Sequence, residues 1–499
     1  MMKRSLTALL SIFLLGNFAL AQVASKHGYR LIQDGEPPDP VERLLSNSVI
    51  DMVPGNGGVF MGTGGGVSYV EVAYTDVDSI GYFWQSFDER HGLGEGSVSA
   101  LDFKDDVLWA ATAYSVSVPE GILPAGGGVG FSTDFGSSWT WFDQPVDPVE
   151  GYDTTLISQP TTTNIQNVTY DLVITSTDVW ITSFGGGLRR YSFADSAWQV
   201  VTPDNNKFDA ADYLNHRAFA VTGDDDVIWV GTAAGVNKST DNGETWENFN
   251  SSDDGLSGNF VTALGRQVYN NNDILWAATW QAESQTEYYG VSKSENGGLT
   301  WEVALTLDDQ ILKAHNFAFD DSIVYAATNV GLYKSVDLGE TWDIFPEIID
   351  FNSGDQLYDP TFYSAQAAGG MLWVGTGDGV ASSPDYGNTW TLHRSFLPTS
   401  EGGQPATYAY PNPYSPRLHP VIRFQYDMTK AGSVTLKIFD FALDEVTTVV
   451  QNKSRGLGDF YEVWTGKRSN GDPVATGVYY YRVERSGMSP EWGKFAVIY

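Results

Sequence analysis

The chain contains no cysteine and, among its 499 residues, carries 28 lysines and arginines against 62 aspartates and glutamates. Without cysteine there are no disulfides and no thiolate chemistry, so the fold must be held by its apolar core. The formal net charge of −34 makes nucleic acid and anionic membranes poor partners, because both would be repelled. Such acidity keeps a chain soluble; clustered carboxylates that bind calcium are the alternative explanation.

Long hydrophobic runs are also scarce, and the clearest one lies at the N-terminus. There Lys3 and Arg4 precede the apolar run 6–15, and an Ala-Leu-Ala cleavage motif ends at Ala21. This pattern predicts a signal peptide over residues 1–21. Because the run is too short to span a bilayer and no later segment is apolar enough, the sequence predicts an exported chain without a transmembrane segment.

Glycine and aromatic residues are abundant, with 53 Gly, 16 Trp and 26 Tyr, and they recur with a period. A short apolar run around one aromatic residue appears seven times at intervals of about 48 residues, one interval being longer by about 22. The aromatic anchors are Phe60, Trp109, Trp180, Trp229, Trp276, Tyr325 and Trp373. Each repeat has room for four short strands, which is typical of a propeller blade, so the sequence predicts a seven-bladed β-propeller over 28–398.

A second motif, Ser-x-Asp-x-Gly-x-Thr-Trp, follows most anchors as a turn between the third and fourth strands. An Asp there can accept hydrogen bonds from turn N–H groups, and the Gly adopts a conformation that other residues resist. Five copies resemble the Asp-box, or BNR repeat; a degenerate copy lies at 192–198, and the first repeat lacks the motif. The acidic or amide positions, expected to be structural, are Asp134, Asp241, Asn296, Asp337 and Asp385.

Three insertions interrupt the repeat at 113–127, 143–166 and 280–289. Because strands in a blade alternate in direction, turns between strands 3 and 4 lie on one face, and all three insertions lie on the other. Long loops gathered on one rim are where binding sites usually evolve. The sequence therefore predicts a ligand face opposite the Asp-boxes.

The candidate ligand-binding residues are the carboxylates and aromatic side chains of two insertions. They are Asp147, Glu150, Tyr152, Asp153, Trp280, Glu283, Tyr288 and Tyr289. Aromatic rings beside carboxylates suit sugar stacking, peptide contacts or calcium, so the expected partners are a polysaccharide, a glycoprotein or a surface protein. The alternative is that these are solvated loop residues. The sequence identifies no catalytic residue, no metal site and no cofactor, with calcium left open.

Asp-box propellers include sialidases and xyloglucanase-type glycoside hydrolases, so catalysis is the competing hypothesis. A sialidase needs an arginine cluster to hold a substrate carboxylate, and the Arg-Ile-Pro signature of that family is absent. The xyloglucanase type generally pairs two propellers, whereas this chain predicts one. The six histidines show no metal-ligand spacing. The sequence therefore favours a binding or scaffold protein, the alternative being a secreted glycoside hydrolase or lyase acting on polysaccharide.

The pattern changes after a predicted linker at 399–407. Residues 408–499 contain about seven short alternating strands separated by turn signals, which predicts an immunoglobulin-like β-sandwich. The phrases Tyr-Pro-Asn-Pro at 410–413, Gly-Val-Tyr-Tyr at 477–480 and the basic-then-apolar ending 493–498 resemble the C-terminal domains of proteins exported by the type IX secretion system. They are also similar to the immunoglobulin-like domain of flagellar hook-capping proteins. The first resemblance implies recognition by the secretion machinery, then surface attachment or release; a plain accessory sandwich is the alternative.

Overall fold

The computed structural model describes residues 38–76, 79–119, 121–147, 161–281, 286–396, 399 and 405–499. The described residues form strands and two short 3-10 helices, η1 (Glu89–His91) and η2 (Leu214–His216), so the protein is all-β. No helix in these ranges is long and apolar enough to cross a bilayer. The chain divides into two compact units, 1–395 and 396–499. The predicted signal peptide lies outside the described residues.

The described part of the first unit folds into seven four-stranded antiparallel sheets, numbered here in chain order. Sheet 1 consists of β1 (Val49–Gly55), β2 (Gly58–Thr63), β3 (Gly66–Asp76) and β4 (Ser79–Phe87). Sheet 2 consists of β5 (Ser97–Lys104), β6 (Val107–Val118), β7 (Gly121–Ser132) and β8 (Thr140–Phe142). Sheet 3 consists of β9 (Thr169–Ile174), β10 (Asp178–Ser183), β11 (Gly187–Ser192) and β12 (Ala197–Val201). In each of them the four strands pair in the order in which the chain enters them.

Sheets 4 to 7 follow the same order. Sheet 4 consists of β13 (Ala218–Gly223), β14 (Ile228–Thr232), β15 (Gly235–Ser239) and β16 (Glu247–Phe249), and sheet 5 of β17 (Phe260–Tyr269), β18 (Asn272–Trp280), β19 (Gly290–Ser294) and β20 (Glu302–Leu305). Sheet 6 consists of β21 (Ala314–Asp320), β22 (Ile323–Thr328), β23 (Gly331–Ser335) and β24 (Asp343–Ile344), and sheet 7 of β25 (Phe362–Ala368), β26 (Met371–Thr376), β27 (Val380–Ser383) and β28 (Thr391–His393).

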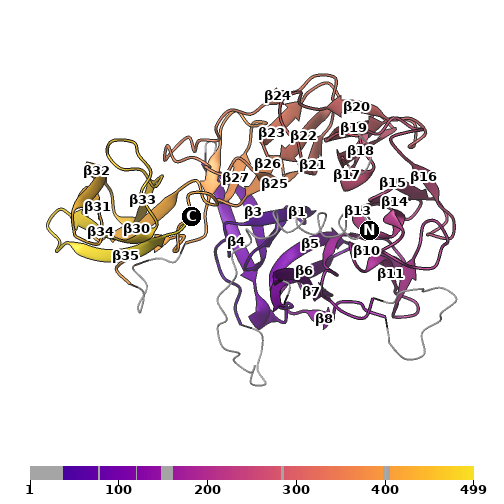
Figure 1. Cartoon of the computed structure of the whole chain (residues 1–499), viewed down its shortest axis with the longest axis horizontal. Coiled ribbons are helices and arrows are strands. Elements are labelled where there is room, and N and C mark those ends of the chain that lie inside the picture. Colours follow the sequence, from indigo (N-terminus) through magenta and orange to yellow (C-terminus); the bar gives the residue numbers. More distant parts are fainter. Residues whose placement is uncertain are drawn as a thin grey trace. The chain divides into compact units, whose positions relative to one another are not determined.

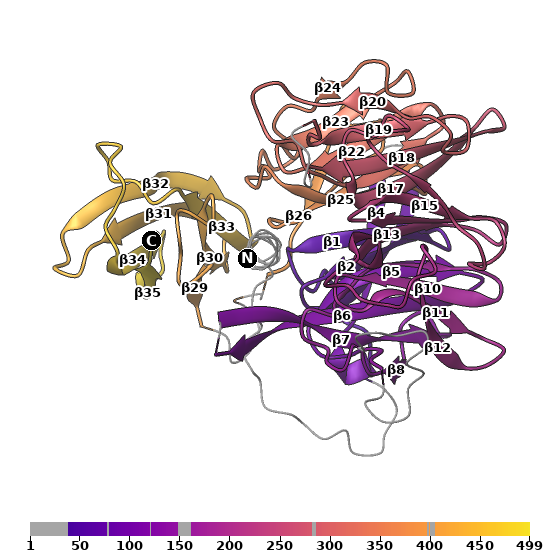
Figure 2. The ribbon, with the colours of Figure 1, turned by 45° about the vertical axis from the view of Figure 1, so that its right-hand side comes forward.

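The seven sheets close into a ring through their first strands. β1, β5, β9, β13, β17, β21 and β25 contact one another in this order, and β25 returns to β1. The sheets stand side by side around this inner circle, as Figures 1 and 2 show. The arrangement is propeller-like, with the first strand of each sheet innermost and the fourth outermost.

The apolar core of the first unit is divided among the seams, by which we mean the interfaces between neighbouring sheets. Second strands are almost wholly buried, since all six residues of β2, β10 and β26 are inaccessible. This places the repeated aromatic anchors inside the seams, where Trp180, Trp276 and Trp373 are fully buried. The periodic aromatic residue in the sequence is thus the residue that fills the space between adjacent sheets.

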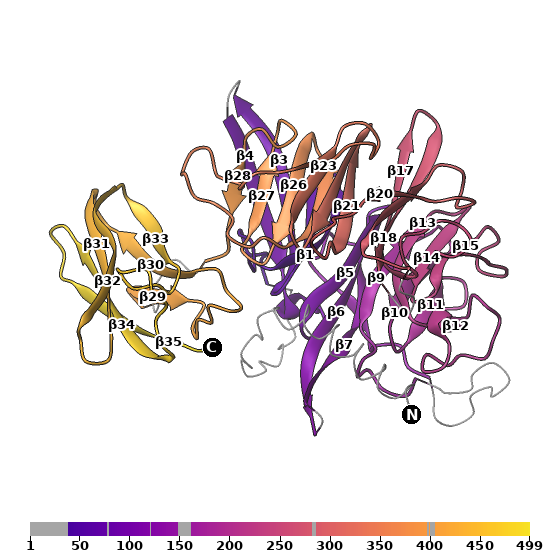
Figure 3. The ribbon, with the colours of Figure 1, turned by 45° about the horizontal axis from the view of Figure 1, so that its top comes forward.

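Two hairpins are longer than the repeat requires. The insertion at 113–127, expected as a loop, is instead a continuation of β6 and β7, which stay paired as far as Val118 and Gly121. The hairpin β3–β4 replaces the turn that the first repeat lacks, and pairs Val70 with Trp84. Figure 3 shows the two hairpins projecting from opposite ends of the ring. Their positions agree with strand parity, because β6–β7 is a 2–3 connection and β3–β4 a 3–4 connection.

The second unit consists of two antiparallel sheets that share one core. One sheet has the order β29 (Thr407–Tyr410), β30 (Ile422–Met428), β33 (Gly458–Trp464); the other has β32 (Glu445–Arg455), β31 (Gly432–Phe439), β34 (Gly477–Arg485), β35 (Glu491–Val497). Inward-facing residues of both sheets, among them Phe424, Tyr481 and Phe495, form a single buried cluster. The predicted linker overlaps this unit, because the buried Thr407 already begins β29.

Candidate functional site

The connections between second and third strands, and between successive sheets, lie at one end of the ring, which we call the insertion end. By strand parity, the described residues of the three insertions belong to this end, opposite the turns between third and fourth strands. Four of the predicted ligand residues, Glu150, Tyr152, Asp153 and Glu283, lie outside the described residues. The structure therefore locates Asp147, Trp280, Tyr288 and Tyr289.

Asp147 is held in a buried ion pair. Its two carboxylate oxygens lie 3.2 and 3.0 Å from the guanidinium nitrogens of Arg189, and the N–H of Thr161 donates to the same group. Both Asp147 and Arg189 are almost completely shielded from solvent. A buried carboxylate needs such a partner, because removing the arginine would leave an uncompensated charge. In this environment Asp147 anchors the loop that follows β8 to β11.

Trp280 and Tyr289 lie together around a lysine at the insertion end of sheet 5. Their ring centroids are 6.2 Å apart, and the Lys313 ammonium lies 4.3 Å from the Trp280 ring and 5.8 Å from that of Tyr289. Burial lowers the pKa of Lys313 and raises that of Tyr289. Tyr288 turns away and is 43% exposed, while its backbone N–H donates to the carbonyl of Ser257.

The Trp280 ring continues a row of aromatic side chains along the inner strands. Phe260 stacks on Trp280 with centroids 5.7 Å apart, and Phe219 lies 4.4 Å from Phe260. Tyr170 follows at 5.8 Å from Phe219. The row therefore crosses sheets 3, 4 and 5 at the insertion end. Since Phe219 and Phe260 are buried, most of this surface serves packing between first strands.

A pocket of about 560 Å³ opens at the insertion end beside the extended β6–β7 hairpin, and we call it the side pocket. Its lining includes two aromatic side chains, two carboxylates and two amides: Tyr114, Trp141, Glu95, Asp143, Gln144 and Asn164. Its volume lies within the range of ordinary small-ligand sites, and its mixture of aromatic and hydrogen-bonding groups is typical of them.

Neighbouring backbone fixes the aromatic wall of the side pocket. The indole Nε1 of Trp141 donates to the carbonyl of Gly127 at 3.0 Å. A Cβ at Gly94 would come within 2.2 Å of the Trp141 ring, so glycine is required for this close approach. The amide of Asn164 donates to the Tyr114 hydroxyl and to the carbonyl of Gly126, both at 2.9 Å. Ring and amide are thus held in place before any ligand arrives.

The sequence did not single out the side pocket. Tyr114, Asp143 and Asn164 fall in predicted insertions, whereas Glu95 and Trp141 lie outside them, and only the fold brings these stretches together. One signal was available: Trp141 follows the Trp139 of a repeated turn, and an aromatic residue there is unusual among the five copies. Among the described residues, no group of three or more His, Asp or Glu side chains is arranged to hold a metal ion.

The opposite end of the ring carries five turns of one design, which we call the repeated turns: 132–139, 239–246, 294–301, 335–342 and 383–390. In each, the serine hydroxyl accepts from the glycine N–H four residues on, at 2.7 to 3.0 Å. The Asp or Asn carboxyl oxygen accepts from the N–H four residues after it, at 2.8 to 3.0 Å. These side chains hold the turn backbone, and the hydrogen bonds lower the pKa of Asp134 and Asp385 although partial burial opposes them.

No family model matches the chain, and no curated protein matches it. Similar solved structures include PorZ, a surface component of the type IX secretion system of Porphyromonas gingivalis, at 13% identity over 89% of this chain and 69% of that one, with a TM-score of 0.35. Another is the GH74 xyloglucanase of Xanthomonas campestris, at 13% identity over 92% and 74%, with a TM-score of 0.47. YCF48 bound to a D1 peptide is 12% identical over 73% and 97%, with a TM-score of 0.40.

Proposed function

We propose that the chain is an exported, seven-bladed β-propeller that binds carbohydrate, either a polysaccharide or the glycan of a glycoprotein, in the side pocket. The observation that carries this proposal is the set of groups lining that pocket. Trp141 and Tyr114 offer aromatic faces, while Glu95, Asp143 and Asn164 offer hydrogen-bonding groups. Sugars present apolar C–H faces and a fringe of hydroxyls, and they need both kinds of group at once.

The propeller assignment rests on the seven four-stranded sheets of the described residues and on the closed circle of their first strands. The five repeated turns have the hydrogen bonds that a structural Asp-box requires. In this proposal the turns hold the blades, and the insertion end presents the ligand.

The test is a glycan binding screen with purified mature protein, followed by the Trp141→Ala variant on every glycan retained. We expect the variant to lose at least tenfold in affinity, because both the stacking of a sugar on the ring and the exclusion of water by it depend on the ring. Trp492→Ala in the second unit is the matched control, since that ring is 50% exposed. A chelator arm tests whether calcium contributes. Unchanged binding by Trp141→Ala, with an unchanged melting temperature, contradicts the proposal.

A glycoside hydrolase or lyase is the second candidate, and the pairing of Glu95 with Asp143 in one pocket is the observation that favours it. Hydrolysis requires two carboxylates that flank the scissile bond. The same screen, scored for released sugar, separates the two functions. Turnover that disappears in both Glu95→Gln and Asp143→Asn, while binding persists, would establish the enzyme.

For the second unit, we infer an immunoglobulin-like domain that directs export through the type IX secretion machinery. Its ending is built into the fold: Phe495 and Val497 are buried, and Tyr414 exchanges backbone hydrogen bonds with Ala496 and Ile498. Recognition would therefore use a folded domain instead of a free tail. Removing 396–499 should retain the first unit in the periplasm. Normal surface delivery of that truncated chain would reject the sorting role.

A further inference from the structure

Four seams of the ring are closed by the same device, which we call the clamp. A cation on the third strand of one sheet is paired in register with that sheet's aromatic anchor, as Lys238 is with Trp229. Its nitrogen donates to a backbone carbonyl in the repeated turn of the next sheet. The four bonds are Arg190 to Asn242 at 2.7 Å, Lys238 to Gly297 at 3.0 Å, Lys293 to Leu338 at 2.9 Å and Lys334 to Tyr386 at 2.9 Å.

In three of these seams the clamp cation also lies over the anchor ring. The charged group is 4.8 Å from the ring centre for Lys238 on Trp229, 5.5 Å for Arg190 on Trp180 and 5.8 Å for Lys334 on Tyr325. Such contacts are cation–π interactions, which strengthen as the pair is shielded from water. Each of these aromatic anchors therefore has an organic cation as its neighbour.

The turn of the next sheet can reach the anchor because it contains glycine. A Cβ on Gly243 would lie 2.6 Å from the Trp180 ring, and one on Gly339 would lie 2.5 Å from Trp276. Any side chain at these positions would hold the turn away from the ring. The clamp thus needs two partners in neighbouring sheets, a cation on one and a glycine turn on the next.

The seam between sheets 2 and 3 lacks both partners. Phe131 occupies the third-strand position opposite the anchor Trp109. The turn of sheet 3 after Ser192 is a short one without glycine, closed by Asp195, whose N–H and carboxylate bond to the serine hydroxyl. This turn brings Phe193, and not a glycine, toward Trp109, and a cavity of about 320 Å³ lies at this place, which we call the seam cavity.

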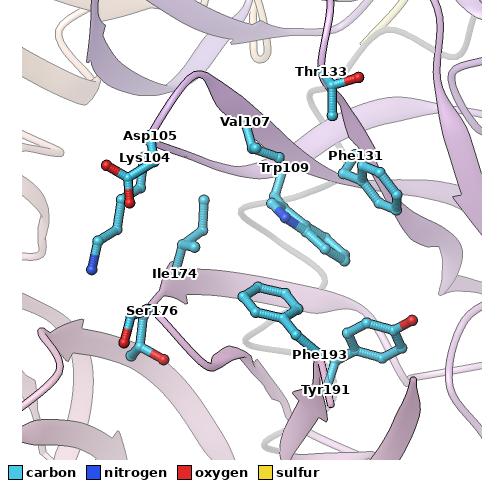
Figure 4. Close-up of a pocket in the computed structure, with 11 residues that line it drawn as sticks. Lys104, Asp105, Val107, Trp109, Phe131, Thr133, Ile174, Ser176, Tyr191 and Phe193 are labelled. Atoms are coloured by element: carbon cyan, nitrogen blue, oxygen red, sulfur yellow. The ribbon is translucent and has the colours of Figure 1, made fainter. Parts of the chain in front are cut away.

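Four aromatic residues are among those that line the seam cavity. Trp109 lies 5.8 Å from Tyr191 and 6.4 Å from Phe193, while Phe131 closes the side at 5.0 Å. Figure 4 shows Trp109 and Phe131 facing Tyr191 and Phe193 across the space. Phe193 is 40% exposed, so the ring nearest to solvent is the one best able to move aside for a ligand.

The charges around the seam cavity favour a positive ligand. The Asp105 carboxylate is part of its lining. Lys104 also lines it, but its ammonium is paired with Asp225 at 3.2 Å. The formal charge of the whole chain, −34, raises the local concentration of cations at its surface.

We propose that the seam cavity binds an organic ammonium or guanidinium cation among the rings of Phe131, Tyr191 and Phe193, beside the buried anchor Trp109. The ligand is either a free small cation, such as a quaternary ammonium compound, or a lysine side chain of a peptide. Both present the same positive group to these rings. This site lies at the end of the ring opposite the side pocket and is independent of carbohydrate binding.

Calorimetric titration of the mature full-length protein tests the proposal with three probes: choline, its neutral carbon analogue dimethylbutanol, and the methylamide of acetyl-lysine, whose side chain carries the ammonium. We expect at least one cation to bind about fivefold or more tightly than dimethylbutanol, as a cation–π contribution requires. Preference for choline identifies a free cation as the source, and preference for the lysine derivative identifies a peptide. Equal binding of dimethylbutanol, or no saturable binding of either cation, overturns the proposal.

Two variants locate the binding. Phe131→Lys restores the third-strand cation of the other seams, and its own ammonium should fill the cavity and abolish binding of the preferred probe. Phe193→Leu removes one ring and should weaken binding about threefold to tenfold. Phe441→Leu in the second unit, at a residue 75% exposed, is the matched control and should bind as the parent does. If both cavity variants bind like the parent, the cation does not occupy this cavity.

Discussion

The ring is closed by different means in its two halves. From sheet 3 to sheet 7, every seam has a clamp, with Arg190 or a lysine bonded to the repeated turn of the next sheet. The other three seams have no clamp cation opposite their anchors: Tyr69, Phe131 and Ser382 stand there in sheets 1, 2 and 7. The seams between sheets 1 and 2 and between sheets 2 and 3 are bridged from the inside, by carboxylates on the first strands.

The inner bridges follow one pattern. The carboxylate of Asp51 accepts from its neighbour Met52 and, at 2.7 Å, from the N–H of Leu101 on the next sheet. Asp102 does the same toward Ile174 at 2.8 Å. Asp171 continues it to the seam between sheets 3 and 4, where Val221 is the donor at 2.8 Å. One seam has both devices, so they are separate solutions to the same packing problem: the clamp acts on outer strands and the bridge on inner ones.

The largest expected effect comes from altering an inner bridge, because the bridging carboxylates of neighbouring sheets are buried near one another. Burial raises the pKa of Asp51 to about 7 and that of Asp102 to about 6, and it raises the pKa of Asp171 as well. A carboxyl whose pKa is higher in the folded chain stabilises the fold fully below its unfolded pKa, near 3.8 for Asp51, and loses that contribution as the pH rises through the folded value.

Asp51→Asn should therefore gain stability relative to the parent as the pH rises from about 5 to about 8, by roughly 3 kcal/mol at most. Asparagine is compatible with this position, since Asn316 of sheet 6 accepts from Ala365 in a related bridge. The measurement is urea unfolding of both proteins across this pH range, with the exposed Asp226→Asn as the control. A difference that does not change with pH would mean that Asp51 stays ionised in the fold.

The features that could be predicted from the sequence are those that recur from one sheet to the next. The period, the anchors and the five turns depend on residues that repeat, and repetition makes each of them visible. The clamp had a signal too, because Lys238, Lys293 and Lys334 each precede the serine of a turn. The inner bridges offered none: Asp51 and Asp171 follow bulges in their strands, and their partners are backbone groups some 50 residues away.

The same reasoning explains what was missed at the insertion end. Asp147 was identified as a candidate because of its residue type and its loop, but whether it faces a ligand or Arg189 depends on tertiary packing. The repeat marks 113–127 only as an insertion and predicts a loop, whereas Pro124 lies in a strand within a paired hairpin. The side pocket and the seam cavity both depend on residues from separate repeats.

The next effect in size concerns a repeated turn, the partner on which the clamps depend. Asp385 accepts from the N–H and hydroxyl of Thr389 and from the hydroxyl of Ser383. Asp385→Ala should lower the free energy of unfolding by roughly 1–3 kcal/mol, since a charged acceptor of several bonds is lost. Thermal unfolding measures it, with the exposed Asp309→Ala as the control. An effect no larger than the control's would show that the turn keeps its shape without the carboxylate.

Removing a clamp cation should cost less than removing a turn, because the anchor remains packed. In Lys238→Met the apolar stem still covers Trp229, while the bond to Gly297 and the cation–π contact are lost. We expect a loss of about 1 kcal/mol in unfolding free energy. Lys207→Met, at an exposed lysine, is the matched control. If both variants unfold alike, the clamp is a consequence of packing between the sheets and adds nothing to their cohesion.

The smallest expected effect concerns the repeated turn 294–301, which has Asn296 where the other four repeated turns have an aspartate. Asn296 holds its turn with the amide oxygen on the N–H of Thr300, but its amide nitrogen must donate to the Thr300 hydroxyl. In the other turns a carboxylate accepts from the corresponding hydroxyl.

Asn296→Asp should stabilise the protein by roughly 0.5–1 kcal/mol near neutral pH, because an ionised acceptor makes the stronger bond. Hydrogen bonds lower the pKa of Asp134 and Asp385 in their turns, so this gain should be lost as the pH falls below about 4. A destabilised variant would mean that repulsion from Glu295 and Glu302, which share Lys293 beside this turn, outweighs the better hydrogen bond.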